Sequence, residues 1–170
     1  DFIKYAIQIA KHSIGTPVKV TWSREEDTTH DYYRPAALAK FKGTSNIDGI
    51  QSLDLQVACP SVLTSQMGRI NIPLAGPDIS IVQAAWEQPY AIEHYKVRGY
   101  RVPEMLPVSS WRSVGASQNG FFHESAIDEL AHYGGIDPLA CRLSLITHEP
   151  SRLVIKKAAE MASWGEKRAE

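Results

Sequence analysis

The sequence predicts an α+β domain, with a mixed or antiparallel sheet from the first two thirds of the chain and helices in the last third. Two observations lead to this prediction. Apolar and polar residues alternate in several segments between residues 17 and 102, as they do in half-buried strands. From residue 117 onward, apolar residues recur at helical spacing between capping residues. Strands early and helices late favour α+β over a regular β–α–β alternation.

Composition limits the function classes. The chain has 170 residues, of which 44% are hydrophobic and 22% charged, as in an ordinary globular domain. Its apolar runs are too short for a membrane-spanning helix. A net charge of -1 lacks the basic excess of a generic nucleic-acid binder, so we expect no nucleic-acid partner. Cys59 and Cys141 stand far apart and form neither a disulfide framework nor a metal motif.

The two ends of the chain carry separate expectations. Residues 1–15 open with apolar residues at helical spacing, and Gly15 ends this predicted helix. Because the apolar stripe begins with almost no lead-in, we expect a fragment of a longer protein; processing or an omitted tag is the alternative. Residues 17–23 are predicted to form a strand and residues 24–31 a polar connection. Residues 165–170 are expected to form a solvated tail.

The middle of the chain predicts most of the sheet. Residues 37–43 and 50–58 both alternate and are predicted to form a β-hairpin. Its turn chemistry comes from Asn46, Asp48 and Gly49. Residues 59–80 are rich in proline and glycine and are predicted to form a long loop. Residues 95–102 are predicted to form a strand, and residues 103–118 an irregular stretch.

The last third predicts three helices. Ser117 is expected to cap a helix over residues 118–133. Asp137 followed by Pro138 predicts the start of a second helix, and Ser151 the start of a third. The residues expected to face inward are Phe122, Ala126, Ile127, Leu130 and Ala131 in the first helix, Leu139, Leu143 and Ile146 in the second, and Leu153, Val154, Ala158, Met161 and Ala162 in the third.

Local motifs for hydrolysis and metal binding are weak. Two residues separate Ser117 from Gly120, so the G-x-S-x-G pattern of a nucleophilic serine fails and a hydrolase is disfavoured. The glycine-bounded start of the following helix predicts either an anion site or a plain helix cap. None of the six histidines forms an HxH or HxxxH pair, so no metal-ligand set is predicted.

Two arginines stand out by their context. Arg34 follows two tyrosines and precedes a proline, and Arg112 lies in SSWRSVG, just before the capped helix. The guanidinium fork is planar and always charged, so an arginine in such a turn is suited to bind an anion or an oxo group. The alternative is a structural arginine that binds loop carbonyls.

Residues 17–43 (PVKVTWSREEDTTHDYYRPAALAKFKG) and 111–146 (WRSVGASQNGFFHESAIDELAHYGGIDPLACRLSLI) together resemble the large subunit of molybdenum hydroxylases. This is the xanthine dehydrogenase/aldehyde oxidase superfamily. The most similar branch is that of isoquinoline 1-oxidoreductase β-subunits and membrane-bound aldehyde dehydrogenases, and residues 88–100 also fit it. The resemblance implies that residues 1–170 form a single partial molybdopterin-binding domain of a bacterial oxidoreductase.

The resemblance also implies site residues. WRSVG, residues 111–115, stands in the place of an FRGFG-like loop that passes the molybdenum. Arg112 matches the loop arginine, whose surroundings bind an oxygen on the metal. Arg34 matches an arginine that orients substrate and stabilises developing negative charge. Val114 replaces an aromatic residue that stacks on flat substrates. The implied cofactor-binding residues are Trp111, Arg112, Ser113, Val114, Gly115, Ser117 and Gln118.

The implied reaction is the hydroxylation of aldehydes or N-heterocycles with water as the oxygen source. It implies a molybdenum–molybdopterin cofactor in a dinucleotide form, [2Fe–2S] clusters on an iron–sulfur small subunit, and a c-type cytochrome as electron acceptor. The family's base glutamate and glycine loop have no match here, so we expect the chain alone to be inactive and to hold no cofactor. The alternative is a non-catalytic scaffold or binding module. We expect a periplasmic or partner-mediated membrane location, with the cytoplasm left open.

Overall fold

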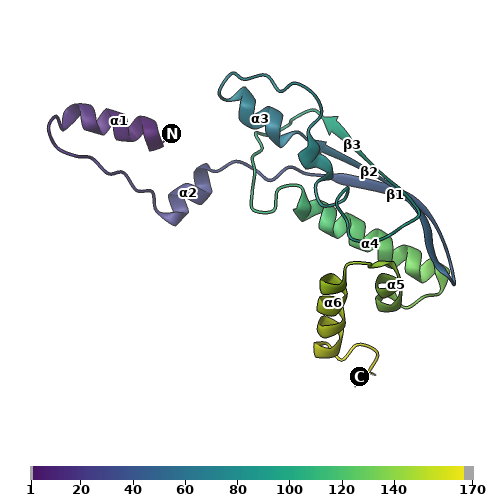
Figure 1. The fold of residues 1–170 in the computed structure, drawn as a ribbon. Helices are drawn as coiled ribbons and strands as arrows, with labels where there is room; N and C mark the ends of the chain where they lie inside the picture. The colour runs from purple at the N-terminus through teal and green to yellow at the C-terminus, as the bar shows by residue number, and fades with distance from the viewer. Residues whose placement is uncertain (1, 167–170) are drawn as a thin grey trace. The chain divides into compact units, whose positions relative to one another are not determined.

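The computed structural model describes residues 2–166. The chain divides into two compact units, Asp1–Tyr33 and Arg34–Glu170 (Figure 1). Within residues 2–166, every helix is too short or too polar to span a bilayer. The predicted α+β class is confirmed by helices together with a three-stranded mixed sheet. The single partial domain predicted over residues 1–170 stays a prediction.

The first unit holds two helices, α1 (Phe2–His12) and α2 (Arg24–His30). The first confirms the predicted N-terminal helix, although none of its residues is buried. The second replaces the predicted polar connection. It forms because the Ser23 side chain accepts a hydrogen bond from the Glu26 N–H at 3.2 Å, and because acidic residues occupy its first turn.

The strand predicted over residues 17–23 is wrong. These residues form no strand in the described part of the chain. Burial does alternate along this segment, since Val18, Val20 and Trp22 are half-buried and the residues between them are exposed. Trp22 packs against another ring: its ring centroid lies 5.7 Å from that of Phe2 in an edge-on contact. Alternation alone does not supply the neighbouring strand that a ladder needs.

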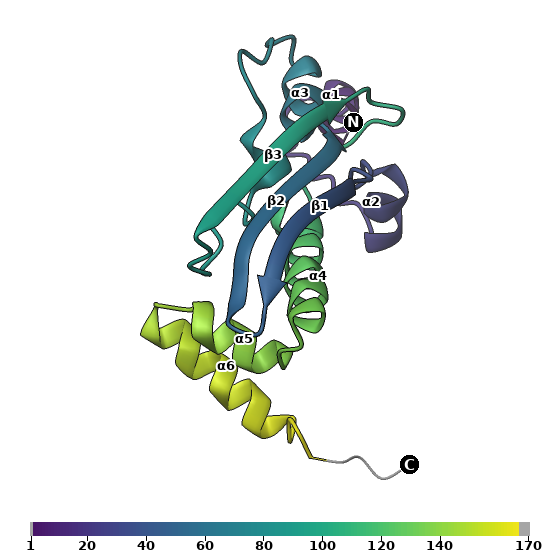
Figure 2. The same cartoon turned by 90° about the vertical axis from the view of Figure 1, so that its right-hand side faces the viewer.

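The sheet of the second unit has the order β1-β2-β3. The hairpin of β1 (Leu38–Asn46) and β2 (Gly49–Pro60) is antiparallel, as predicted. The third strand, β3 (His94–Val102), pairs with β2 in parallel and confirms the predicted strand there. Figure 2 shows the three strands side by side with a long helix behind them.

The long loop predicted over residues 59–80 is wrong in part. It contains the helix α3 (Val62–Gly68) and the start of the 3₁₀ turn η1 (Ile79–Val82). The Ser61 side chain caps α3 by accepting a hydrogen bond from the Thr64 N–H at 3.0 Å. A parallel strand pair requires a long crossover, and this segment supplies part of it.

The long helix, α4 (Ala116–Gly134), packs against β1 and β2. It confirms the predicted core positions Ala126, Ile127, Leu130 and Ala131, and Phe122 is half-buried. The predicted cap is wrong: the N-cap residue is Gly115, and no side chain caps the helix. The Ser117 hydroxyl instead accepts a hydrogen bond from Arg34.

The second predicted helix is confirmed as α5 (Pro138–Leu145), whose N-cap Asp137 accepts a hydrogen bond from the Ala140 N–H at 2.9 Å. The third, α6 (Glu149–Met161), begins before the predicted Ser151. Its predicted inward face is wrong. The following residues are all exposed: Leu153, Val154, Ala158, Met161 and Ala162. Ile155 packs against the core instead. Of the predicted tail, residues 167–170 lie outside the described residues.

The core lies between one face of β2 and the helices. Leu53, Leu55, Val57 and Cys59 alternate along β2, and each is at most 1% exposed. Leu53 belongs to a cluster with α4 and α5, whereas the other three pack with Ile81 and Ala85 in and beside η1. This second cluster supports the end of the sheet where β2 and β3 terminate and α4 begins.

Candidate functional site

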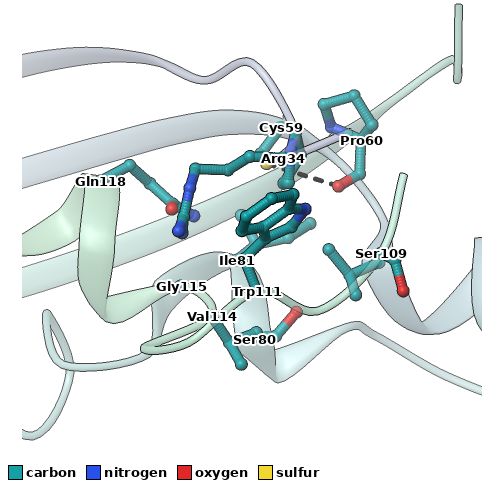
Figure 3. A pocket seen from close by; sticks show the side chains of 12 residues that line it. Arg34, Cys59, Pro60, Ser80, Ile81, Ser109, Trp111, Val114, Gly115 and Gln118 are labelled. Atoms are coloured by element: carbon teal, nitrogen blue, oxygen red, sulfur yellow. Dashed lines mark hydrogen bonds between the residues drawn. The ribbon is translucent and has the colours of Figure 1, made fainter. Parts of the chain in front are cut away.

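A small pocket lies at the carboxyl end of β2, beside the start of α4 (Figure 3). Its enclosed volume is about 10 Å³, room for roughly one water molecule. Four separate segments contribute to it. The lining residues are Arg34, Pro35, Cys59, Pro60, Val62, Ser80, Ile81, Ser109, Trp111, Val114, Gly115 and Gln118. The pocket therefore brings Arg34 together with most of the predicted cofactor-binding loop.

Arg34 reaches the start of α4 across a long sequence separation. Its Nη1 donates a hydrogen bond to Ser117 Oγ at 2.8 Å. Its guanidinium carbon lies 5.8 Å from the centroid of the Trp111 ring, within cation–π range. The Ser117 hydroxyl in turn lies 3.4 Å from the Arg112 carbonyl oxygen, to which it donates. One hydroxyl thus joins Arg34 to the backbone of the turn that carries Arg112.

The turn formed by residues 111–115 is strained, and its first three residues are exposed. Trp111 is 40% exposed, and Arg112 and Ser113 are exposed as well. The Val114 N–H donates a hydrogen bond to the Trp111 carbonyl at 2.9 Å. Ser113 and Val114 have φ values of 76° and 44°, in the left-handed region that side chains disfavour. Each such residue costs of order 1–3 kcal/mol, so surrounding contacts must hold the turn.

Those contacts come from η1 and the residues after it. A Cβ atom on Gly115 would lie 1.7 Å from the Ser80 carbonyl oxygen, so only glycine permits this approach. The Gly115 N–H donates to Gln83 Oε1 at 3.2 Å. Asn119 Nδ2 donates to the carbonyl oxygens of Ile81 and Gln83 at 2.8 and 2.9 Å. Sequence reasoning missed Gln83 and Asn119, because no motif joins residues so far apart in the chain.

Helix α3 and the residue after it hold the segment that leads into the turn. Gln66 Nε2 donates to Ser109 Oγ at 3.1 Å and to Ser110 Oγ at 2.9 Å. Arg69 Nη1 donates to the Val108 carbonyl oxygen at 3.1 Å. These bonds fix the segment predicted as irregular, so it enters the site from a defined direction.

Two titratable groups beside the pocket have shifted pKa values. Burial, with a smaller contribution from Asp78, raises the pKa of the Cys59 thiol to about 11, so the thiol stays protonated at neutral pH. Burial would also raise the pKa of Asp78, but hydrogen bonds from Ser61, Ser80 and the Leu63 N–H outweigh it and lower that pKa. Within residues 2–166, no cluster of acidic, histidine or cysteine side chains is suited to hold a metal.

Residues 2–145 match the family described as the molybdopterin cofactor-binding domain. The chain belongs to this family. This molybdopterin cofactor-binding domain is 31% identical over 167 residues to a nicotinate dehydrogenase subunit of Pseudomonas putida, a match that covers 92% of the chain and 14% of that relative. It is 26% identical over 166 residues to the beta subunit of isoquinoline 1-oxidoreductase of Brevundimonas diminuta, covering 93% of the chain and 20% of the relative.

These matches confirm the predicted family, that of the large subunit of molybdenum hydroxylases. The chain spans about a fifth or less of the length of either relative. Both relatives are named as subunits. The roles of the individual site residues stay predictions.

The polar groups at the site fit a molybdopterin. Gln118 Oε1 is buried and has no hydrogen-bond partner within residues 2–166, which leaves an acceptor for a pterin N–H. Arg112 is an exposed residue, and its guanidinium is a group that binds phosphate or oxo oxygens. The enclosed pocket is too small for a pterin ring. The enclosed pocket alone would therefore not hold the whole cofactor.

Proposed function

We propose that this domain belongs to an oxidoreductase that hydroxylates an N-heterocycle or an aldehyde, with water as the oxygen source. The observation that supports this proposal most directly is the position of Arg34 beside the turn of Trp111 and Arg112. A fixed cation next to an exposed cofactor loop stabilises negative charge that develops on a substrate, which is an electrostatic role of the oxyanion type.

Each site residue has a proposed part in holding the molybdopterin or the substrate. The molybdenum centre, when bound, supplies the oxidation and the water-derived oxygen. Gln118 would accept a hydrogen bond from the pterin, and Arg112 would bind an anionic or oxo group of the cofactor. Ser117 keeps the Arg34 fork in one orientation. Val114 leaves space where a larger ring would stack, so the substrate contact falls to Trp111 and Arg34.

The names of the relatives favour an N-heterocycle over an aldehyde. Nicotinate and isoquinoline are both nitrogen heteroaromatics with a six-membered nitrogen ring. Arg34 can hold a carboxylate or a ring nitrogen's developing anion, whereas a simple aldehyde offers only one oxygen. We therefore propose a nitrogen heteroaromatic as the substrate class. We also propose a dinucleotide form of the pterin, an iron–sulfur small subunit and a c-type cytochrome acceptor.

The test uses the full-length protein that carries this domain, produced with its partner subunits. We would measure molybdenum per polypeptide and the reduction of a dye acceptor by nicotinate, isoquinoline and benzaldehyde. Arg34→Ala should lower kcat by about 10²–10³-fold if Arg34 stabilises transition-state charge. Arg152→Ala is the matched control, because Arg152 lies in α6, away from the site, and binds the Leu143 carbonyl of α5.

The outcomes separate the alternatives. Wild-type turnover in Arg34→Ala would reduce Arg34 to a structural role. Stoichiometric molybdenum without turnover of any of the three substrates would favour the non-catalytic scaffold. Turnover of benzaldehyde alone would overturn the proposed substrate class, although the oxidoreductase assignment would stand.

A further inference from the structure

Asn119 is an unusual buried side chain near the site. It is 0% exposed and lies on the buried side of α4, which it shares with Ala126, Ile127 and Leu130. Burying an amide in such a position costs free energy unless its polar atoms are bonded. Its Nδ2 is bonded twice, to the carbonyl oxygens of Ile81 and Gln83, but its Oδ1 has no partner within residues 2–166. An apolar side chain of similar size would avoid that cost, so helix packing alone does not explain the amide.

The two bonds of Asn119 join α4 to the segment that supports the strained turn. The same segment presents the Ser80 carbonyl to Gly115 and the Gln83 side chain to the Gly115 N–H. Ala84, just beyond it, also has a positive φ of 67°. Residues 80–84 and the start of α4 therefore hold each other through three hydrogen bonds and one close backbone contact.

This junction adjoins the left-handed residues Ser113 and Val114, because Gly115 follows them directly. Strained backbone persists only where its surroundings over-determine it. The hydrogen bonds that the Val114 N–H and the Ser113 carbonyl form are short-range, to the Trp111 carbonyl and from the Ala116 N–H. The junction adds a long-range restraint on the backbone at the end of the turn.

We propose that Asn119 and Gln83 are positioning residues that hold the Trp111–Gly115 turn in its left-handed conformation for the molybdopterin. They act through the backbone of the turn and touch neither substrate nor cofactor themselves. The role in cofactor retention rests on the proposed function, whereas the effect on the turn depends only on the junction.

The test uses the full-length protein with its partner subunits and compares Asn119→Asp with wild type. Aspartate keeps the shape of the side chain but removes both donors and places its oxygens against two carbonyl oxygens. Amide hydrogen exchange of residues 111–117 should then accelerate at least about tenfold, because local opening becomes easier. Molybdenum per polypeptide should fall at least about threefold if the turn must be preformed to bind its ligand.

The matched control is Ser45→Ala. Ser45 Oγ donates to the Leu130 carbonyl at 2.6 Å, so it also ties α4 to another segment, but at the far end of the helix. This variant should change neither readout. If Asn119→Asp accelerates exchange throughout β2, the fold has loosened and Gln83→Met becomes the deciding variant. It removes the acceptor for the Gly115 N–H without placing a charge in the core.

Unchanged exchange at residues 111–117 in the deciding variant would overturn the proposal. Faster exchange with wild-type molybdenum content would also overturn it, because the junction would then be only structural. Absence of molybdenum from the wild-type protein would refute the proposed function instead, and the exchange readout would still decide whether the junction holds the turn.

Discussion

Replacing Gly115 by alanine should destabilise the second unit strongly. The new Cβ would lie 1.7 Å from the Ser80 carbonyl oxygen and 2.9 Å from its carbon, whereas real Cβ atoms essentially never approach closer than 3.0 Å. The obstacle is backbone, so it cannot rotate away. Relief requires η1 and α4 to separate by roughly 1 Å, which in a packed region costs about 1–3 kcal/mol or more.

The separation would also stretch the hydrogen bond from the Gly115 N–H to Gln83 and the two bonds of Asn119. Each lost bond adds about 1 kcal/mol. With all three bonds lost, we therefore expect Gly115→Ala to lower the free energy of unfolding by about 4–6 kcal/mol. Urea denaturation followed by circular dichroism measures this directly.

Gly120→Ala is the control from the same helix. A Cβ there meets nothing within 4 Å. Alanine is a better helix former than glycine, so this variant should gain about 0.5–1 kcal/mol. Equal stability of Gly115→Ala and wild type would refute this reasoning, since it would mean that the Ser80 carbonyl does not lie close to Gly115.

Three further changes test other parts of the second unit. Leu130→Ala should lower the free energy of unfolding by about 2–5 kcal/mol, because Leu130 is 5% exposed and packs in the cluster that contains Leu53; a change near zero in urea denaturation would show that Leu130 does not contribute to the core. Arg142→Met should cost about 1–2 kcal/mol, because Arg142 bonds the half-exposed Glu124; a thermal melt checks this, and an unchanged midpoint contradicts it. Asp78 has a lowered pKa, so its stabilisation is full above the unfolded-state pKa of about 3.9 and is lost as pH falls through the lower folded value. Asp78→Asn should therefore be less stable than wild type at pH 6, and the difference should shrink by about pH 2; a constant difference would show that the carboxylate charge is irrelevant.

The parts of the fold that could be predicted have local causes. The hairpin follows from alternation on both strands and from turn residues between them, and the β1–β2 register keeps the alternation of β2 on one face. Helix α5 follows from Asp137 and Pro138, which act within one turn. In each case the residues that determine the element lie inside it or beside it.

The helices that were not predicted, α2 and α3, differ in the strength of their sequence signals. Ser23 and Glu26 form a capping-box spacing, and acidic residues follow Ser23, so α2 carried a signal that the polar composition of residues 24–31 obscured. In α3, Ser61 is a capping residue, but the prolines and glycines of residues 59–80 favour the prediction of a loop. The exposed face of α6 has another origin: periodicity identifies an apolar stripe but not its partner, and Ile155, outside the predicted stripe, is the α6 residue that packs against the core.

The candidate site also has features that the sequence predicts and features that it does not predict. The resemblance of two sequence blocks to a known family predicts Arg34, Trp111 and Ser117 as site residues, and the structure brings Arg34 into contact with the other two side chains. No local pattern predicts that the Ser80 carbonyl meets Gly115, because the contact depends on how the crossover after β2 packs. Contacts of that kind are set by the tertiary fold, and a single sequence does not encode them in any short motif.

At the start of α4, the usual side-chain cap of a helix is absent. A serine near a helix start normally caps it, which contributes about 0.5–2 kcal/mol. Here the Ser117 hydroxyl accepts from Arg34, and the cap position is held by Gly115, which has no side chain to offer. Glycine is required there because of the Ser80 carbonyl, and the serine two residues later then orients an arginine. The helix therefore begins without a side-chain cap, and the Ser117 hydroxyl accepts a hydrogen bond from Arg34 instead. Natural proteins depart from local rules of this kind mostly at functional or strained positions, and the turn before α4 contains two residues with positive φ.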